Sequence, residues 1–437
     1  MKCFCKSFHK HKVADIIILV FLIILSGCAT ADHRFTLMET PVIYHEADID
    51  PFAHLDDAQK TTSSSLFYAT NRNPQPSKPE QPYGNGISTR LHVGRTSILM
   101  GDANTRWEQL YQASISAFRE EPVELHLGET KEMASMAQDD YLDEDQVLSP
   151  SLKDFADAIN AELTNSKDKE LMIYVHGAKF DFFRSCALTA ELDHFAGRDF
   201  VGIAFSWPSH QNILTYITGI DVHRAWSSTR SFRSLIRFLS RSTTAKTINI
   251  ICYSAGGRLV SKALFEMRQM HTDLNPDELK NRYRLGAVIF AAADVSIDDF
   301  LHRLPGISDL SRQVVVTISD GDDVLKTASV VMGGAPRMGT DEAELIEEEF
   351  AMFRAIQNLE IVDLSRGKED RGFDITGHHY WYRNPWASSD IIFLLRTDLP
   401  GHRRGLSPSE DQQIWFLGPN YPVQVRDAAR KELSGQW

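Results

Sequence analysis

The sequence predicts an α/β protein with a mostly parallel sheet that carries helices on both faces. From residue 171 onward, short and almost unbroken apolar runs alternate with segments whose apolar residues recur at helical spacing. Strands that are apolar along their whole length are typical of a parallel sheet covered on both sides. Polar residues also follow directly after several of these runs, at the edge where such sheets place their functional sites.

About eight strands are expected, and each is a short run of apolar or alternating residues. They are 65–70, 92–100, 171–175, 200–205, 248–253, 285–292, 313–319 and 359–364. The expected helices have one apolar stripe at a period of about 3.6 residues. They are 151–163, a segment after residue 177, 224–240, a segment directly after Ser254, and 341–357.

The N-terminus predicts an exported lipoprotein. Four lysines within the first twelve residues precede an apolar run at 16–25, which is too short to span a bilayer and fits a signal peptide. Leu25-Ser26-Gly27-Cys28 resembles the lipobox of bacterial lipoproteins, which implies cleavage before Cys28 and acylation of its thiol and new amino group. Ala29 implies sorting to the outer membrane, facing the periplasm. A plain signal peptide or an uncleaved anchor is the alternative.

The rest of the chain is expected to form one domain. The predicted parts are a signal peptide at 1–27, a polar tether at 28–62, the α/β domain at 63–400 and a C-terminal tail at 401–437. Residues 101–168 lack clear periodicity apart from the 151–163 helix, so they are expected to be an irregular insertion in this domain.

Composition excludes several classes of function. The chain of 437 residues is 43% hydrophobic and 24% charged, as in ordinary globular proteins, and its formal charge of −13 argues against nucleic-acid binding. Cys186 and Cys252 lie in apolar stretches and are expected to be buried free thiols. No C-x-x-C pair suggests a metal or redox centre, and Gly333-Gly334 lacks the Lys-Ser/Thr ending of a phosphate loop. No metal or cofactor is therefore expected.

The strongest chemical signal is Ser254. A β-branched run ends in Cys252-Tyr253-Ser254-Ala255-Gly256, and an amphipathic helix follows at once. Strand, tight turn and helix with serine at the apex are the layout of a nucleophile elbow, usually written G-x-S-x-G. Cys252 replaces the first glycine, which is a mild departure because cysteine is small and packs as an apolar residue.

Two further side chains complete a candidate catalytic triad. Asp322 follows the strand at 313–319, and His378 follows the strand at 359–364, so serine, acid and histidine occur in the order of α/β-hydrolases. The histidine would take the proton of Ser254, and the acid would orient and stabilise the imidazole. The alternatives are Asp320, Asp323 and Asp294 for the acid and His379 for the base.

An oxyanion hole can also be predicted. The Ala255 N–H is one donor by its position after the nucleophile, and the Ala178 N–H after His176-Gly177 is the second. His176 itself is expected to organise its loop and not to act as the base.

These residues resemble a bacterial family of uncharacterised α/β-hydrolases, over nearly the full length beyond the tether. The resemblance implies one α/β-hydrolase domain, with Asp322 as the acid and His378 as the base. Tyr253, Ala255, Gly257, Lys179, Phe180 and His379 depart from the family's usual residues at positions that affect the pocket wall and leave the triad intact. The matching landmarks are 67–72 (FYATNR), 83–85 (YGN), 175–177 (VHG), 205–209 (FSWPS), 254–256 (SAG), 319–325 (S-x-x-D-x-x-L) and 377–380 (G-H-x-Y).

The sequence thus predicts a serine hydrolase that acts on a carboxylic ester or thioester, with an acyl ester or lipid-like substrate. Ile213, Leu214, Tyr216 and Ile217 are expected to form a small apolar flap. Two alternatives stay open. One is a non-catalytic lipoprotein that uses a hydrolase scaffold as a binding module. The other is an acyltransferase that uses the same three residues.

Overall fold

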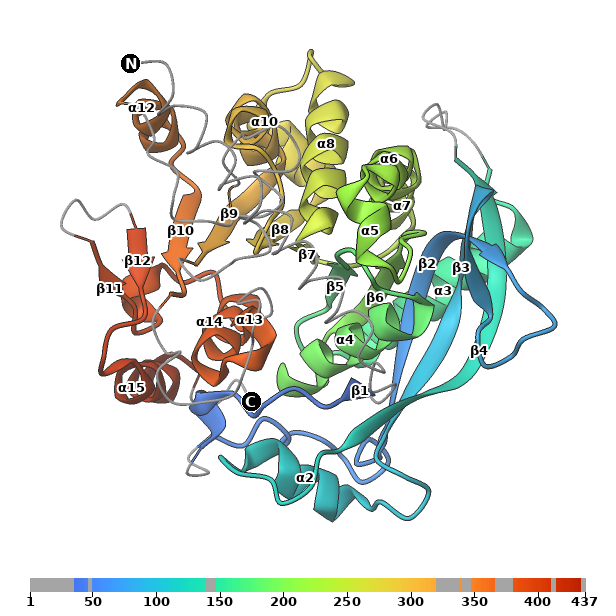
Figure 1. Ribbon diagram of the computed structural model, residues 1–437, viewed down its shortest axis with the longest axis vertical. Helices are drawn as coiled ribbons and strands as arrows, with labels where there is room; N and C mark the ends of the chain where they lie inside the picture. The colour runs from blue at the N-terminus through green and yellow to red at the C-terminus, as the bar shows by residue number, and fades with distance from the viewer. Residues whose placement is uncertain are drawn as a thin grey trace, which may run out of the picture.

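The structure is a computed structural model, and it describes residues 35–45, 49–138, 147–319, 338, 347–365, 380–409 and 414–433. Its centre is one mixed sheet (Figure 1). Within the described residues this sheet has 12 strands, in the order β1-β4-β3-β2-β6-β5-β7-β8-β9-β10-β12-β11. The strands are β1 (Phe35–Thr36), β2 (Ser63–Pro74), β3 (Tyr83–Met100), β4 (Glu124–Ala137), β5 (Glu170–Val175), β6 (Val201–Ser206), β7 (Thr247–Tyr253), β8 (Leu285–Ala291), β9 (Ser311–Ile318), β10 (Leu359–Asp363), β11 (Ser407–Pro408) and β12 (Ile414–Phe416).

The middle of the sheet is parallel from β2 to β12, and antiparallel pairs extend it at both sides. β2, β3, β4 and β1 pair antiparallel on one side, and β11 pairs antiparallel with β12 on the other. The predicted α/β class with a mostly parallel sheet is therefore confirmed. The sheet is larger than the eight strands expected, because β1, β11 and β12 were not recognised and β4 was not counted among the eight.

The helices lie on both faces of the sheet. Apolar residues of α3, α7, α8, α9 and α10 form one core cluster with the sheet, and residues of α4, α13, α14 and α15 form the second cluster with the N-terminal segment. The helices are α2 (Trp107–Ile115), α3 (Pro150–Asn165), α4 (Phe182–Phe195), α5 (Ile213–Ile217), α6 (Ile220–Ser227), α7 (Thr229–Ser242), α8 (Ala255–Gln269), α9 (Pro276–Tyr283), α10 (Ile297–Leu310), α12 (Glu347–Ala355), α13 (Tyr380–Arg383), α14 (Pro385–Arg396), α15 (Tyr421–Leu433), and the 3-10 turns η1 (Val42–Tyr44) and η2 (Gly401–Arg403).

The expected tether at 28–62 is wrong for the residues that the structure describes. Ile43, Tyr44, Phe52 and Leu55 are buried, and the Tyr44 hydroxyl donates to the Phe195 carbonyl at the end of α4. This segment shows no period because single apolar residues, spaced by turns, fill gaps in the second core cluster. It is part of the domain.

The expected irregular insertion and tail are also structured. Within 101–168, α2 and the 14-residue strand β4 precede α3, and α3 begins at Pro150 as predicted, with the Ser149 hydroxyl accepting from the Leu152 N–H. After residue 401, α15 buries Tyr421, Val425 and Leu433 against the domain. Among the described helices, none is both long and apolar enough to cross a membrane.

Candidate active site

Ser254 stands at a strained turn between β7 and α8. Its φ is 51° and its ψ is −120°, a conformation that residues with a side chain rarely adopt. Three backbone hydrogen bonds hold the turn: the Ser254 N–H donates to the Ala291 carbonyl (3.0 Å), and the Ser254 carbonyl accepts from Gly257 (2.9 Å) and Asp294 (3.1 Å). This is the geometry of a nucleophile elbow.

The small residues around Ser254 are sterically required. A Cβ atom at Gly256 would lie 2.6 Å from the Val175 carbonyl oxygen, and one at Gly257 would lie 2.9 Å from the Ala293 Cβ. Cys252, at the usual first glycine position, is accommodated because its buried thiol faces the Ile289 carbonyl at 3.3 Å. Cys186 and Cys252 are both buried free thiols, as predicted.

The loop after β5 lies directly beside the serine. A Cβ atom at Gly177 would be 3.0 Å from the Ser254 Cβ, so the loop backbone approaches the nucleophile closely. Ala178 is the next residue along this loop, and Ala255 is the first residue of α8, where backbone N–H groups are free of helical partners. The structure thus brings together the loop of one predicted oxyanion donor and the helix start of the other; the oxyanion role of Ala178 and Ala255 stays a prediction.

His176 holds this loop in place. Its buried ring is stacked between Phe180 (5.5 Å between centroids) and Trp207 (5.1 Å). Its Nδ1 lies 2.7 Å from the Gly177 carbonyl, and the Trp207 indole N–H donates to the His176 carbonyl (2.7 Å). Burial, and then the nearby Arg72 cation, lower the pKa of His176 well below its usual value. A buried imidazole with these partners organises the loop and is poorly placed to be a general base.

Arg72 is the residue of this region that sequence reasoning did not single out. It is fully buried, and its guanidinium donates to the Ser206 hydroxyl (2.9 Å) and to the Phe180 carbonyl (2.7 Å). Further donations reach the Asn85 side-chain oxygen (3.1 Å) and the Ser209 carbonyl (3.4 Å). Desolvation lowers the pKa of Arg72 to about 10. Arg72 therefore joins the loops after β5 and β6 to the β2–β3 hairpin. The sequence feature that could have pointed to Arg72 is its position at the end of the FYATNR segment.

Asp294, an alternative acid, is engaged elsewhere. Arg258 Nε lies 3.1 Å from Asp294 Oδ2, and Arg258 Nη2 lies 3.1 Å from Asp294 Oδ1. Both carboxylate oxygens are thus bound by one guanidinium in a buried ion pair. The Arg258 Nε also donates to the Tyr216 hydroxyl (3.2 Å), which ties α5 to α8. This arrangement argues for a structural role of Asp294.

The other predicted site residues lie outside the described residues. These are Asp322 and His378, their alternatives Asp320, Asp323 and His379, and Cys28. The described chain nevertheless continues to both sides of the predicted histidine. Tyr382, four residues after His378 in the sequence, has its ring 6.0 Å from the ring of Tyr253, which directly precedes Ser254.

The expected flap consists of two short helices, α5 and α6, that connect the end of β6 to α7. Asp221 is fully buried, lies 2.8 Å from His210 Nδ1 and accepts a hydrogen bond from the Thr215 hydroxyl (2.7 Å). Tyr216 is buried and Leu214 is exposed. Polar contacts within residues 210–221 therefore fix the conformation of this flap, and the Tyr216–Arg258 hydrogen bond joins it to α8.

A family model matches residues 152–393, which include the elbow and the His176 loop; its description is "Alpha/beta hydrolase of unknown function (DUF900)". The chain belongs to this family. The predicted α/β-hydrolase fold and the predicted family of uncharacterised hydrolases are both confirmed.

Three solved structures share weak similarity with this chain. A crystal structure of esterase B from Lactobacillus rhamnosis covers 60% of this chain and 78% of its own, at 11% identity and a TM-score of 0.30. Two inhibited forms of esterase B give TM-scores of 0.28 and 0.22, at 11% and 14% identity; they cover 52% and 43% of this chain and 77% and 74% of their own. Similarity at this level carries no argument about the site. Among curated proteins, none matches the chain.

Proposed function

We propose that this protein is a serine hydrolase that cleaves a carboxylic ester or thioester through an acyl-enzyme. The observation that carries the proposal is the backbone of Ser254, whose φ of 51° at the end of a parallel strand costs about 1–3 kcal/mol; strain of this kind concentrates at active sites. Membership of an α/β-hydrolase family supports it.

In the proposed mechanism, Ser254 Oγ attacks the acyl carbon while His378 takes its proton. Asp322 fixes the imidazole and stabilises its positive form. The N–H groups of Ala255 and Ala178 stabilise the negative oxygen of the tetrahedral intermediate, and each such donor contributes about 10²–10³ in rate. The intermediate collapses to an acyl-enzyme and releases the alcohol or thiol, and water then attacks the acyl-enzyme with His378 as base.

Two observations support the roles of Asp322 and His378. Ser319, three residues before Asp322, is buried directly after β9 at the same sheet edge as Ser254. Tyr382, four residues after His378, packs beside Tyr253.

We also propose that the substrate is an acyl ester of the membrane surface and that an acylated Cys28 anchors the protein in the bacterial envelope, at the outer membrane facing the periplasm. The lipobox supports the anchor. The test is metabolic labelling with an alkyne analogue of palmitate, which should tag the wild type and not Cys28→Ala. Labelling of both proteins alike would overturn the anchor.

The test of the enzyme is a fluorophosphonate probe together with a series of nitrophenyl esters of increasing acyl length. Labelling of the wild type and loss of labelling in Ser254→Ala, with turnover of at least one ester, is the expected result. No labelling of the wild type would favour the non-catalytic binding module. Labelling without ester turnover would favour the acyltransferase.

A further inference from the structure

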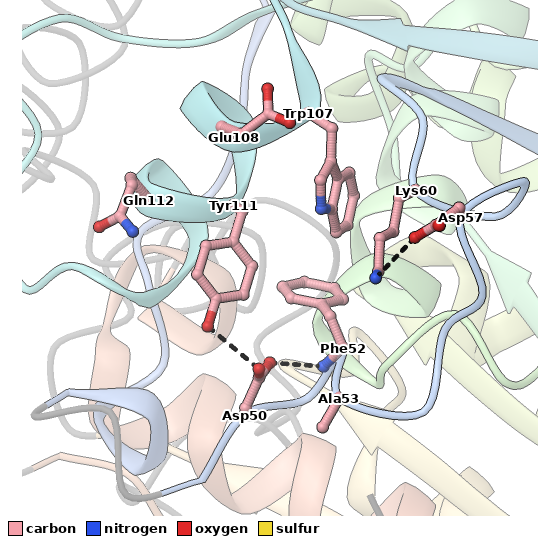
Figure 2. A pocket seen from close by; sticks show the side chains of 9 residues that line it. All are labelled: Asp50, Phe52, Ala53, Asp57, Lys60, Trp107, Glu108, Tyr111 and Gln112. Carbon is pink, nitrogen blue, oxygen red and sulfur yellow. Dashed lines mark hydrogen bonds and ion pairs between the residues drawn. The ribbon is translucent and has the colours of Figure 1, made fainter.

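A second concave site lies away from Ser254, where residues 50–60 pass beneath α2. The cavity has a volume of about 560 Å³, within the range of small-molecule sites. Figure 2 shows its aromatic wall, formed by Phe52, Trp107 and Tyr111, and the polar side chains around it. Glu108 and Gln112 come from α2 in the same view.

This cavity is at the opposite edge of the sheet from the candidate active site. The Arg198 guanidinium lies 4.9 Å from the centre of the Trp107 ring and donates to the Thr61 carbonyl (2.8 Å). Arg198 and Thr61 directly precede β6 and β2, so the cavity lies where the parallel strands begin. Ser254 follows the end of β7, where such strands finish.

Some of the lining groups are already committed to the walls. Asp50 accepts from the Phe52 N–H (2.9 Å) with one oxygen and from the Tyr111 hydroxyl (3.0 Å) with the other. Asp57 and Lys60 form an ion pair at 3.1 Å, drawn in Figure 2. Ring contacts of Phe52 with Trp107 (5.3 Å) and Tyr111 (6.0 Å) complete the frame. The aromatic wall is therefore fixed before a ligand arrives.

Other lining groups remain available to a ligand. Within the part of the chain that the structure describes, no hydrogen bond or ion pair engages the Glu108 carboxylate, the Gln112 amide or the Trp107 indole N–H. Figure 2 shows the indole nitrogen on the side of the ring that faces Tyr111. The site thus offers a charged acceptor, an amide and a donor next to apolar ring surface.

This combination matches a hydroxylated ring. We propose that the cavity binds a neutral saccharide, whose apolar C–H face packs on Tyr111 while its hydroxyl groups donate to Glu108 and accept from the Trp107 indole N–H. The carboxylates of Asp50, Asp57 and Glu108 disfavour an anionic ligand. The carboxylates would attract a cation, but Arg198 already lies over the Trp107 ring, where a quaternary ammonium would otherwise make its cation–π contact; choline tests this alternative. Binding here is independent of the chemistry at Ser254.

The test is isothermal titration calorimetry on the full chain in detergent, with triacetylchitotriose, maltotriose, trigalacturonic acid and choline as probes. At least one neutral trisaccharide should bind saturably, and trigalacturonic acid should bind at least about tenfold more weakly, because carboxylates repel it. Glu108→Ala should weaken the neutral trisaccharide about tenfold through loss of a charged hydrogen bond. Glu121→Ala, an exposed acid beyond the same helix, is the matched control and should change nothing.

Trp107→Phe keeps one aromatic ring but removes the indole donor together with the second fused ring, so it should weaken binding while the protein stays folded. The proposal is overturned if no neutral saccharide binds, if Glu108→Ala and Glu121→Ala bind alike, or if choline binds and the saccharides do not.

Discussion

The two edges of the sheet are built in different ways. Where the strands end, Ser254 is strained and almost fully buried, and Arg72 and His176 are buried polar groups whose hydrogen bonds fix three loops. Where the strands begin, Trp107 is half-buried and the Asp57–Lys60 pair is exposed to solvent. The first edge fixes atoms in one geometry, as chemistry requires. The second presents an accessible ring surface, as reversible binding requires.

The largest expected effect concerns the strained serine. Ser254→Ala should lower the kcat for a nitrophenyl ester by about 10⁶-fold, because the nucleophile of a triad cannot be replaced. Steady-state kinetics measure it, with Glu121→Ala as the control that retains full activity. Retention of more than a tenth of the activity would mean that Ser254 is not the nucleophile and that this edge of the sheet is not the catalytic one.

The next effect separates a structural acid from a catalytic one. Asp294→Asn should lower the free energy of unfolding by about 3–5 kcal/mol, because the buried Arg258 cation loses the carboxylate that accepts two of its hydrogen bonds. The folded fraction should still react with a fluorophosphonate probe. Urea denaturation and probe labelling measure the two properties. A stable variant that does not react would instead make Asp294 the acid of the triad.

Lys60→Met is the matched change at the other edge. Its partner Asp57 is exposed, so solvent screens the pair and the urea midpoint should not move measurably. A large shift there would show that both edges depend on their ion pairs.

Arg72→Met tests the hub of the loops around Ser254. The variant removes the buried donor of the Ser206 hydroxyl and of the Ser209 carbonyl, while the Phe180 carbonyl keeps only the Ser209 hydroxyl; the loss should cost about 3 kcal/mol of unfolding free energy. Activity should fall as well, since the loop at Gly177 loses its support. A variant that is destabilised and fully active would limit Arg72 to stability alone.

The last effect is a pH dependence, spread over several pH units, on the side of the N-terminal segment. Burial raises the pKa of Glu191 to about 8, while the hydrogen bond from the Met38 N–H and the Arg119 cation act in the opposite direction. An unfolded glutamate has a pKa of about 4.3. Between these two pH values only the folded state keeps the proton on Glu191, so rising pH lowers the free energy of unfolding. This loss of stability levels off above about pH 8.

Glu191→Gln removes this proton exchange. The unfolding free energy of the variant minus that of the wild type should rise between about pH 5 and pH 8, with a slope of at most about 1.4 kcal/mol per pH unit. Urea titrations at pH 5, 6, 7 and 8 measure the difference. A difference that is flat with pH would contradict the raised pKa.

The sequence predicted the elements with a periodic apolar pattern and the turn that carries a known motif. The central strands and helices were predicted because buried parallel strands are apolar throughout, and the elbow because its small residues and serine occupy fixed positions. β4 was not counted because charged residues obscure its alternation: Glu129 and Lys131 lie on its solvated face, and Glu132 on the other face accepts a hydrogen bond from the Tyr83 hydroxyl. Residues 35–62 were misread because isolated apolar residues pack without a period. Arg72 was not predicted as a site residue because arginine is rarely fully buried, and its partners are loop carbonyls that a sequence pattern does not identify.

The packing of the chain from Phe35 onward limits how far the domain can stand from a bilayer. Phe35 pairs with Leu125 of β4, and its ring lies 6.1 Å from the ring of Phe183. Phe183 is in the first turn of α4, the helix that follows the Gly177 loop. Seven peptide steps connect Cys28 to Phe35, and even fully extended they reach about 25 Å. With Cys28 acylated, Phe35 could therefore lie no more than about 25 Å from the anchoring residue. The domain would be confined to the surface of the leaflet that holds the acyl chains.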